Sequence, residues 1–282
     1  MTTIAFVVHP HHPDAPSIAA VAEEWLTARG HGVVHVGDLS AHPSPPSLDG
    51  SVDLAVSLGG DGTMLRTVAL AGAHGIPVLG VNLGRLGYLT EVEPQGLNAA
   101  LERFLAGQYT LETRMTLEVT PEPADPGRRR AGEGPILVLN EAVVEKTVPG
   151  HTIRVAASIA GRPFVTYVAD GLLVSTPTGS TAYNLSARGP IVSPGLRAVV
   201  LTPVSPHMLF DRSVVLEPEQ WIRLELMGPR PALLVLDGEG AQVLEPGDAV
   251  VCRVGPTPAR FVTFGPRDFF SILRARFHLA DR

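Results

Sequence analysis

Cysteine is nearly absent from this 282-residue sequence, in which Cys252 is the only one. A single cysteine excludes an internal disulfide framework, and it is typical of proteins in a reducing cytoplasm, where we therefore expect this chain. Cys252 lies in the apolar, strand-like run DAVVCRV. We interpret it as a core side chain rather than a nucleophile.

Lysine is equally scarce. Lys146 is the only lysine among the 22 lysines and arginines, so a phosphate site in this chain has to use arginine, backbone N–H groups or metal ions. The formal net charge is −6, which argues against nucleic acid or an anionic membrane as a partner.

Long hydrophobic runs are also missing, and none reaches the length of a membrane-spanning helix. The N-terminal stretch MTTIAFVVHPHHPD has neither a basic n-region nor a long apolar h-region, so we expect no signal peptide. Apolar residues make up 45% and charged residues 18% of the chain, which is typical of a globular protein. Its length suits two domains.

The apolar pattern divides the chain into two kinds of structure. Continuous apolar runs alternate with helical patterns over residues 1–110, which predicts an α/β domain with a mostly parallel sheet. Residues 111–260 are rich in short Val-, Thr- and Ile-containing runs separated by turn residues, which predicts a β-rich domain. Residues 261–282 end in an amphipathic helix that we expect to pack back on the N-terminal domain. Ligands often bind between two such domains.

The stretch VSLGGDGTMLR, residues 56–66, is the clearest candidate site. Gly59 and Gly60 end a predicted parallel strand, and Gly62 and Thr63 begin the helix that follows. Ligands bind at this edge of open α/β sheets, because glycines let a phosphate approach the backbone and the helix N-terminus favours an anion. No Gly-Lys-Ser/Thr follows, so this is not a Walker A loop.

Asp61 is unexpected in such a turn, because a carboxylate repels a neighbouring phosphate. It can take part in the chemistry, bind a metal or accept a hydrogen bond from a hydroxyl group. The alternative is that Asp61 is simply the N-cap of the helix.

The Gly-Gly-Asp-Gly-Thr stretch resembles the signature of the NAD kinase family. It is shared more loosely with diacylglycerol and sphingosine kinases and, as Gly-Gly-Asp-Gly-Ser, with phosphofructokinases. Further segments narrow the resemblance to NAD kinases: GVNLGRLGYL (80–89), LNEAVVEK (139–146), DGLLVSTPTGSTAYNLSARGPIV (170–192) and LTPVSPHML (201–209). The resemblance implies the two-domain architecture of NAD kinases and diacylglycerol kinases.

The implied reaction transfers the terminal phosphoryl group of ATP, or of polyphosphate, to the adenosine 2′-hydroxyl of NAD⁺. Asp61 matches the family's proton acceptor and would act as general base or orienting group, with metal ligation as the rival role. The resemblance implies a divalent cation, Mg²⁺, as cofactor with ATP, without a dedicated metal site in the protein. It also implies a homodimer or homotetramer.

The resemblance assigns NAD contacts residue by residue. Asp61 and Gly62 would contact the ribose region together with Asn140 and Glu141, and Asp170 would lie near the nicotinamide. The remaining implied contacts are His151, Thr181, Ala182, Tyr183, Asn184, Ser186, Asp237 and Glu239. From the residues alone, Asn140-Glu141 is better explained as the cap of a strand or turn. STAYNLSARG also fits a capped helix start, and His151 a surface residue.

The implied ATP and phosphate contacts are Gly59, Gly60, Gly62, Thr63 and Arg66. Arg66 lies one turn into the predicted helix and is either a phosphate clamp or a surface residue. The chain departs from the family at Leu83, where a threonine is common, so one hydroxyl contact is missing there.

Three other functions fit part of the pattern. A lipid kinase would need an apolar groove and leaves the match over residues 170–186 unexplained, and a phosphofructokinase would need downstream motifs that this chain lacks. A non-catalytic NADP-binding sensor would keep the pocket but has no use for Asp61 beside the transferred phosphate.

Overall fold

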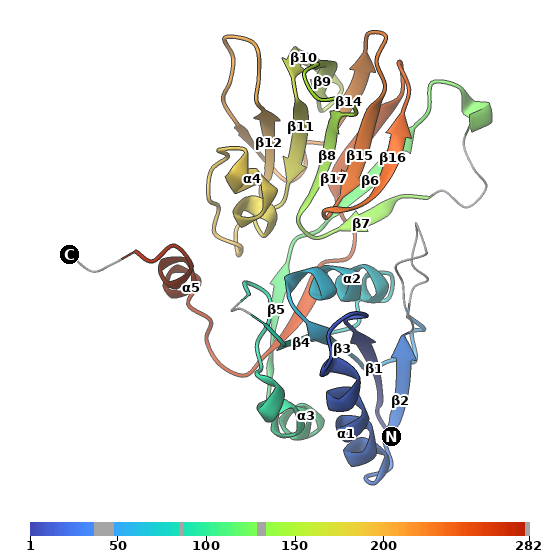
Figure 1. Ribbon diagram of the computed structural model, residues 1–282, viewed down its shortest axis with the longest axis vertical. Coiled ribbons are helices and arrows are strands. Elements are labelled where there is room, and N and C mark those ends of the chain that lie inside the picture. The colour runs from blue at the N-terminus through green and yellow to red at the C-terminus, as the bar shows by residue number, and fades with distance from the viewer. Residues whose placement is uncertain (37–47, 85–86, 129–133, 280–282) are drawn as a thin grey trace. The chain divides into compact units, whose positions relative to one another are not determined.

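The computed structural model describes residues 1–36, 48–84, 87–128 and 134–279 (Figure 1). The chain divides into two compact units. Unit 1 consists of Met1–Arg114 and Thr257–Arg282, and unit 2 of Met115–Pro256. The division expected from the sequence was 1–110, 111–260 and 261–282. Of the 121–135 loop, residues 129–133 lie outside the described part of the chain.

Unit 1 is built on one six-stranded sheet among the described residues. Its strands are β1 (Thr3–Val8), β2 (Gly32–Val36), β3 (Leu54–Gly59), β4 (Val78–Asn82), β5 (Thr110–Arg114) and β18 (Ala259–Thr263). The order is β2-β1-β3-β4-β18-β5, and every neighbouring pair is parallel except β18 with β5. The mostly parallel sheet expected from the continuous apolar runs is confirmed.

The helices of unit 1 lie between these strands in the sequence, except for the C-terminal helix, which follows the last strand (Figure 1). They are α1 (Ala15–Thr27), α2 (Asp61–Gly72), the 3₁₀ turn η1 (Pro94–Gly96), α3 (Leu97–Leu105) and the C-terminal α5 (Phe269–Arg276). Strands β3 and β4 are buried along their whole length. The core of this unit joins them to the inner faces of α1 and α3.

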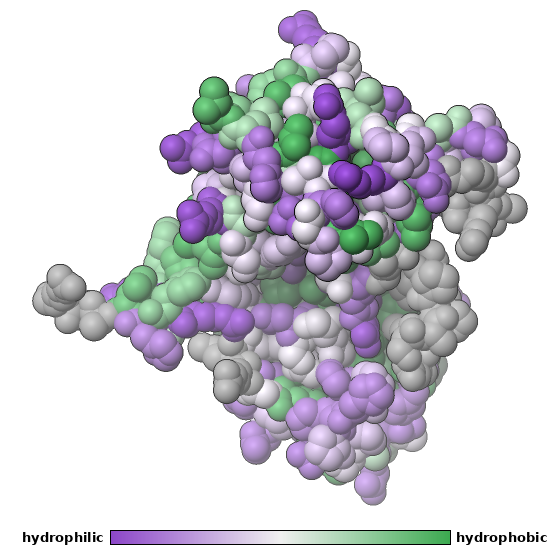
Figure 2. Space-filling view, turned by 45° about the horizontal axis from the view of Figure 1, so that its top comes forward, coloured by the Kyte–Doolittle hydropathy of each residue, from purple (hydrophilic) through white to green (hydrophobic). Residues whose placement is uncertain are grey.

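Helix α5 differs from α1, α2 and α3 because none of its residues is buried. Phe270 is 65% exposed and Phe277 42% exposed. Apolar areas, drawn in green, interrupt the otherwise polar surface in Figure 2. Asp268 caps α5 by accepting a hydrogen bond from the backbone N–H of Phe270 at 3.0 Å.

Unit 2 consists of two antiparallel sheets of six strands each within the described residues. The first has the order β10-β9-β14-β17-β6-β7 and the second β13-β12-β11-β8-β15-β16. The first contains β6 (Leu117–Glu122), β7 (Ile136–Val138), β9 (Ile153–Ile159), β10 (Arg162–Ala169), β14 (Ile222–Met227) and β17 (Ala249–Val254). The second contains β8 (Glu141–Lys146), β11 (Gly171–Ser175), β12 (Val199–Val204), β13 (Val214–Leu216), β15 (Ala232–Leu236) and β16 (Glu239–Leu244).

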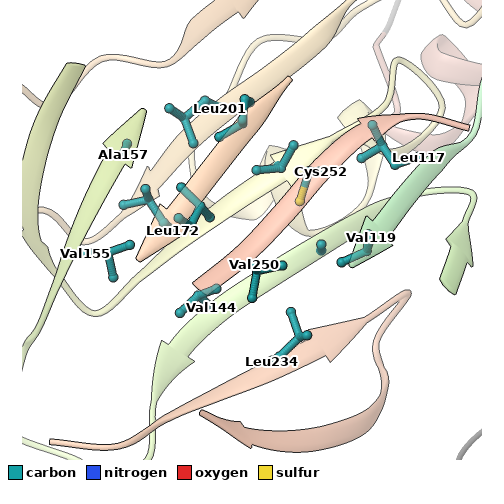
Figure 3. Close-up of a cluster of buried hydrophobic side chains, with 14 of the residues drawn as sticks. Leu117, Val119, Val144, Val155, Ala157, Leu172, Leu201, Leu234, Val250 and Cys252 are labelled. Carbon is teal, nitrogen blue, oxygen red and sulfur yellow. The ribbon is translucent and has the colours of Figure 1, made fainter. Parts of the chain in front are cut away.

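One core joins the two sheets of unit 2, because side chains from both belong to the same buried cluster (Figure 3). Cys252 lies within this cluster and is 1% exposed, as a core side chain should be. Burial raises the pKa of its thiol to about 12. It is therefore an unreactive thiol.

Short helical segments complete unit 2: η2 (Pro126–Arg128), η3 (Gly179–Thr181) and α4 (Tyr183–Ser186). Among the described residues of the whole chain, no helix is long and apolar enough to cross a membrane.

Candidate functional site

The glycine-aspartate turn lies at the carboxyl end of β3, as the sequence predicts. β3 ends at Gly59, and α2 begins at Asp61. Gly60 is the N-cap, with an extended backbone (φ −101°, ψ −164°) and no side-chain cap. The interpretation of Asp61 as an N-cap residue is therefore wrong. Asp61 is the first helical residue, where its negative charge interacts favourably with the helix dipole.

The Asp61 carboxylate is held by a different segment, the loop after β4. Oδ2 accepts a hydrogen bond from the backbone N–H of Tyr88 at 3.0 Å, and Oδ1 accepts one from Leu89 at 3.1 Å. The sheet explains this meeting, because Gly59 and Asn82 are paired partners at the ends of adjacent parallel strands. The loops that follow β3 and β4 therefore begin side by side.

Gly87 allows this contact. A Cβ atom built on Gly87 would overlap Asp61 Oδ1. Any larger residue at position 87 would thus push the carboxylate away from the two amides.

The glycines of the turn have different reasons for being glycine. A Cβ on Gly59 would overlap the side chain of Thr63, so Gly59 is required by packing. A Cβ on Gly60 or Gly62 would meet nothing within 4 Å. Neither has a positive φ, so the protein's own packing and backbone give no reason for glycine there. The backbone there is open to close approach by a ligand.

The two other predicted phosphate contacts lie on α2. Thr63 is 4% exposed, and its buried hydroxyl has no hydrogen-bond partner among the described residues. Arg66 is half-buried.

In unit 2, Asn140 and Glu141 lie where β8 begins. Glu141 is 4% exposed, and its Oε2 has no hydrogen-bond partner in the described part of the chain. Burial, together with the nearby Asp237 charge, raises the pKa of Glu141 to about 8, although an N–H bond from Tyr183 opposes the shift. At neutral pH the Glu141 carboxyl group is therefore largely protonated, and it can both donate and accept a hydrogen bond.

Asp237 holds the backbone of this segment. Its carboxylate accepts hydrogen bonds from the N–H groups of Leu139 (2.8 Å), Asn140 (2.7 Å) and Glu141 (3.1 Å). Burial raises the pKa of Asp237 to about 6, while these three N–H bonds lower it. The residue has a left-handed backbone (φ 50°), which turns the chain between β15 and β16.

Asp170 forms an ion pair with the single lysine of the chain, Lys146, at 2.8 Å. Partial desolvation of the Tyr183 ring raises the pKa of its hydroxyl, and the charges of Glu145, Asp170 and Glu141 raise it further. Tyr183 thus lies within electrostatic reach of two predicted site residues, Glu141 and Asp170. Glu141 and Asp170 themselves lie at opposite ends of the β8–β11 ladder, in which Glu141 pairs with Ser175 and Glu145 with Gly171.

Asn184 is fully buried and bonded internally. Its Nδ2 donates to the carbonyls of Ser180 (3.2 Å) and Pro190 (3.0 Å), and its Oδ1 accepts from the Thr202 hydroxyl at 2.7 Å. These bonds fix the short α4.

The other predicted contacts of this unit are less buried. Thr181 and Ala182 are half-buried, whereas His151, Tyr183, Ser186 and Glu239 are exposed. Thr181 donates through its hydroxyl to the Thr178 carbonyl at 3.3 Å.

Sequence reasoning did not find the Tyr88 and Leu89 amides or the pairing of Lys146 with Asp170. Backbone N–H donors cannot be recognised from residue type. The one hint in the sequence was Gly87 in the segment GVNLGRLGYL, which directly precedes Tyr88 and Leu89.

Comparisons with known proteins agree with this arrangement. Residues 41–109 match the family model of the ATP-NAD kinase N-terminal domain, and residues 139–264 match that of the ATP-NAD kinase C-terminal domain. A curated NAD kinase from Heliobacterium modesticaldum is 44% identical over 283 residues, and the alignment covers 98% of each of the two chains. One from Syntrophotalea carbinolica is 37% identical with full coverage of both chains.

Two solved structures have the same fold. An NAD kinase from Archaeoglobus fulgidus in complex with ATP superposes with a TM-score of 0.73 at 26% identity, covering 97% of this chain and 98% of that one. Yeast NADH kinase complexed with NADH gives a TM-score of 0.87 at 24% identity, with coverage of 100% and 89%.

Proposed function

Because this chain belongs to the NAD kinase family, we propose that it transfers the terminal phosphoryl group of ATP to the adenosine 2′-hydroxyl of NAD⁺, giving NADP⁺ and ADP. It is thus a phosphotransferase with an alcohol group as acceptor. Inorganic polyphosphate is the alternative donor.

The observation that carries the chemical proposal is the fixed Asp61 carboxylate. Each carboxylate oxygen has two acceptor sites, and the Tyr88 and Leu89 amides use one on each. The remaining sites can accept the 2′-hydroxyl group, so Asp61 can orient this hydroxyl without losing its own support.

In the reaction, the ribose oxygen forms a bond to the γ-phosphorus while the bond from that phosphorus to the leaving ADP oxygen breaks. The hydroxyl proton passes to Asp61 and from there to solvent. Phosphoryl transfer depends mainly on positioning and charge stabilisation, so the orienting role of Asp61 contributes at least as much as its basicity.

The phosphates of ATP approach the turn around Gly60 and Gly62, where no side chain obstructs the backbone. Gly59, Thr63 and Arg66 complete the proposed phosphate site. The divalent cation, Mg²⁺, enters bound to the phosphates of ATP and neutralises their charge. Among the described residues, no three His, Cys, Asp or Glu side chains are grouped to hold a metal ion.

Unit 2 supplies the other NAD contacts in this proposal. Glu141 and Asn140 bind ribose hydroxyls, and the unpartnered Glu141 Oε2 supports this because it lacks a partner that a substrate can provide. Asp170, which lies at the other end of the β8–β11 ladder from Glu141, and Tyr183 contact other parts of NAD⁺ in this proposal. The same site includes His151, Thr181, Ala182, Asn184, Ser186, Asp237 and Glu239, of which Asn184 and Asp237 act through the segments that they hold.

We further propose that the protein forms a homodimer or homotetramer and is located in the cytoplasm. Light scattering coupled to size-exclusion chromatography measures the oligomeric state directly.

The decisive experiment compares Asp61→Asn with the native chain in an assay of NADP⁺ formation from NAD⁺ and MgATP. We expect kcat to fall by about 100-fold or more, because general-base groups contribute on this scale, with KM for NAD⁺ nearly unchanged. Asp14→Asn is a matched control, since Asp14 is exposed and makes no capping hydrogen bond with its side chain. An Asp61→Asn variant as active as the native chain would remove Asp61 from the chemistry.

The same assay separates the enzyme from a non-catalytic sensor. A sensor would bind NADP⁺ tightly in calorimetry yet form no NADP⁺ from NAD⁺ and MgATP. That result would overturn the proposed transfer.

A further inference from the structure

Arg267 lies about 200 residues from Asp61 in the sequence, yet the two contact the same short loop. The guanidinium group of Arg267 donates from Nη2 to the carbonyls of Tyr88 and Thr90, both at 3.0 Å, and from Nη1 to Leu89 at 3.5 Å. Three consecutive carbonyls of the loop are therefore bound to one side chain. Tyr88 and Leu89 are the residues whose N–H groups hold the Asp61 carboxylate.

A second set of contacts fixes Arg267 itself. Its Nε lies 3.4 Å from Glu91 Oε2, and the two side chains are only 13% and 15% exposed. Glu91 Oε1 in turn accepts a hydrogen bond from the backbone N–H of Phe264 at 3.0 Å. Because β18 ends at Thr263, the support of the loop reaches back to the central sheet of unit 1.

We propose that Arg267 is a positioning residue for Asp61, which acts by fixing the Tyr88–Thr90 backbone so that two N–H groups hold the carboxylate in place. This inference rests on the proposed role of Asp61 in the transfer. Arg267 does not touch the reacting atoms in this scheme.

The geometry explains why an arginine suits this position. The guanidinium group is a planar fork with five donors, so one side chain can bind three carbonyls and a carboxylate together. A lysine has one nitrogen with three donors and cannot reach all four groups. Without Arg267 the Tyr88–Thr90 loop would lose the hydrogen bonds that fix its peptide planes. The direction of the two N–H groups would then vary.

The first test is kinetic. In Arg267→Ala we expect kcat to fall by about 10- to 100-fold, because small misplacements of a catalytic group cost this much, with KM for NAD⁺ and for ATP changed by less than about 3-fold. Arg267→Lys should recover part of the lost kcat. Arg260→Ala is the matched control, because Arg260 in the same unit donates to the Gly75 carbonyl at 3.1 Å, away from the Asp61 loop. Its kcat should equal that of the native chain.

The second test is a double-mutant cycle with Asp61→Asn, which separates positioning from a purely structural role. If Arg267 acts through Asp61, Arg267→Ala should lower kcat in the native chain but scarcely in the Asp61→Asn background. Equal losses in both backgrounds, or a raised KM with intact kcat, would overturn the inference and leave the role of Asp61 standing. An Asp61→Asn variant with native kcat would overturn both.

Gly87→Ala perturbs the same carboxylate without touching Arg267, which keeps the proposal testable if Arg267→Ala does not fold. The added methyl group would overlap Asp61 Oδ1, so we expect a fall in kcat of at least about 10-fold. Gly265→Ala is its control, because Gly265 is exposed and a Cβ there meets nothing within 4 Å. A Gly87→Ala variant with native kcat would show that the amide-held position of Asp61 is unimportant.

Discussion

Among single residues, Glu141 combines deep burial with an acidic group. Its side chain is almost inaccessible, and its pKa is raised to about 8 by burial and by the charge of Asp237. In the unfolded chain a glutamate has a pKa of about 4.3. The folded protein therefore binds this proton more tightly than the unfolded chain does.

The pH dependence of stability follows from this difference. Because the folded state holds the extra proton, raising the pH through the interval from about 4.5 to 8 costs folding free energy that glutamine would not cost. We expect Glu141→Gln to match the native chain near pH 4.5 and to be more stable at pH 9. The gain should reach about 2 kcal/mol or more, since each unit of pKa difference is worth about 1.4 kcal/mol.

Urea unfolding curves of both proteins between pH 4.5 and 9 measure this effect. Glu102→Gln serves as control, since Glu102 is exposed on α3. Stability curves of Glu141→Gln and the native chain that run parallel over this range would mean that Glu141 is ionised in the folded protein.

At the scale of elements, α4 depends on tertiary bonds rather than on its own helix. It has only four residues, too few for a helix to be stable alone. Asn184 ties it to Ser180, Pro190 and β12 through three hydrogen bonds. A Cβ on Gly189 would overlap the Asn184 side chain, so the absence of a side chain at position 189 leaves the space that Asn184 needs for these hydrogen bonds.

Replacing Asn184 by alanine should therefore destabilise the protein by about 2–4 kcal/mol, because buried carbonyls lose their donors and a small cavity forms. Calorimetric unfolding of Asn184→Ala measures the loss. Ser186→Ala, at an exposed position of the same helix, should stay within about 0.5 kcal/mol of the native chain. Equal stability of Asn184→Ala and Ser186→Ala would contradict the proposed tie.

The helices and strands also show how much of the fold can be predicted from the sequence. The strand β3, the helix α2 and the strand β4 are evident from their apolar runs, and the glycine-aspartate turn between β3 and α2 is predicted in place. Strands β16 (Glu239–Leu244) and β18 (Ala259–Thr263) are not indicated by the pattern. β16 contains glycine and glutamine, and β18 is five residues long and follows two prolines. Its pairing with β4 and β5 is a contact between distant parts of the chain.

The candidate site was predictable to a similar degree. Residue types alone pointed to Asp61, because a carboxylate among three glycines has few structural uses, whereas Asn140 and Glu141 were assigned by the resemblance to NAD kinases. The partners of Asp61 were not predictable, since they are backbone amides placed by a neighbouring loop. The carboxyl group of Asp237 binds three amides of a segment about a hundred residues away, and only the folded sheet brings them together.

For the whole molecule, the path of the chain between its two units is the decisive feature. The chain leaves unit 1 after Arg114 and returns at Thr257, so β18 is the last strand added to the first sheet. It lies between β4 and β5 in that sheet. Unit 2 is a single continuous segment, and the backbone N–H of Gly255 donates to the Thr116 carbonyl at 2.8 Å, which joins its two ends.

These facts predict different behaviour for separate fragments. Residues 115–256 contain a complete core and paired ends, so this fragment should fold alone. Residues 1–114 lack β18, which leaves β4 and β5 without their shared neighbour, so this fragment should remain largely unfolded. Ala259 pairs with Arg114 in the antiparallel β5–β18 ladder. Joining residue 114 to residue 257 by a short Gly-Ser loop should therefore restore a folded unit 1.

Circular dichroism and amide NMR spectra of the three fragments test this directly. We expect dispersed spectra and cooperative thermal unfolding for 115–256 and for the joined unit 1, and narrow dispersion for 1–114. The joined unit 1 tests the role of β18 most sharply, because it differs from 1–114 only by the loop and residues 257–282. If 1–114 folded as well as the joined unit, β18 would be an accessory strand rather than a necessary part of the sheet that carries Asp61.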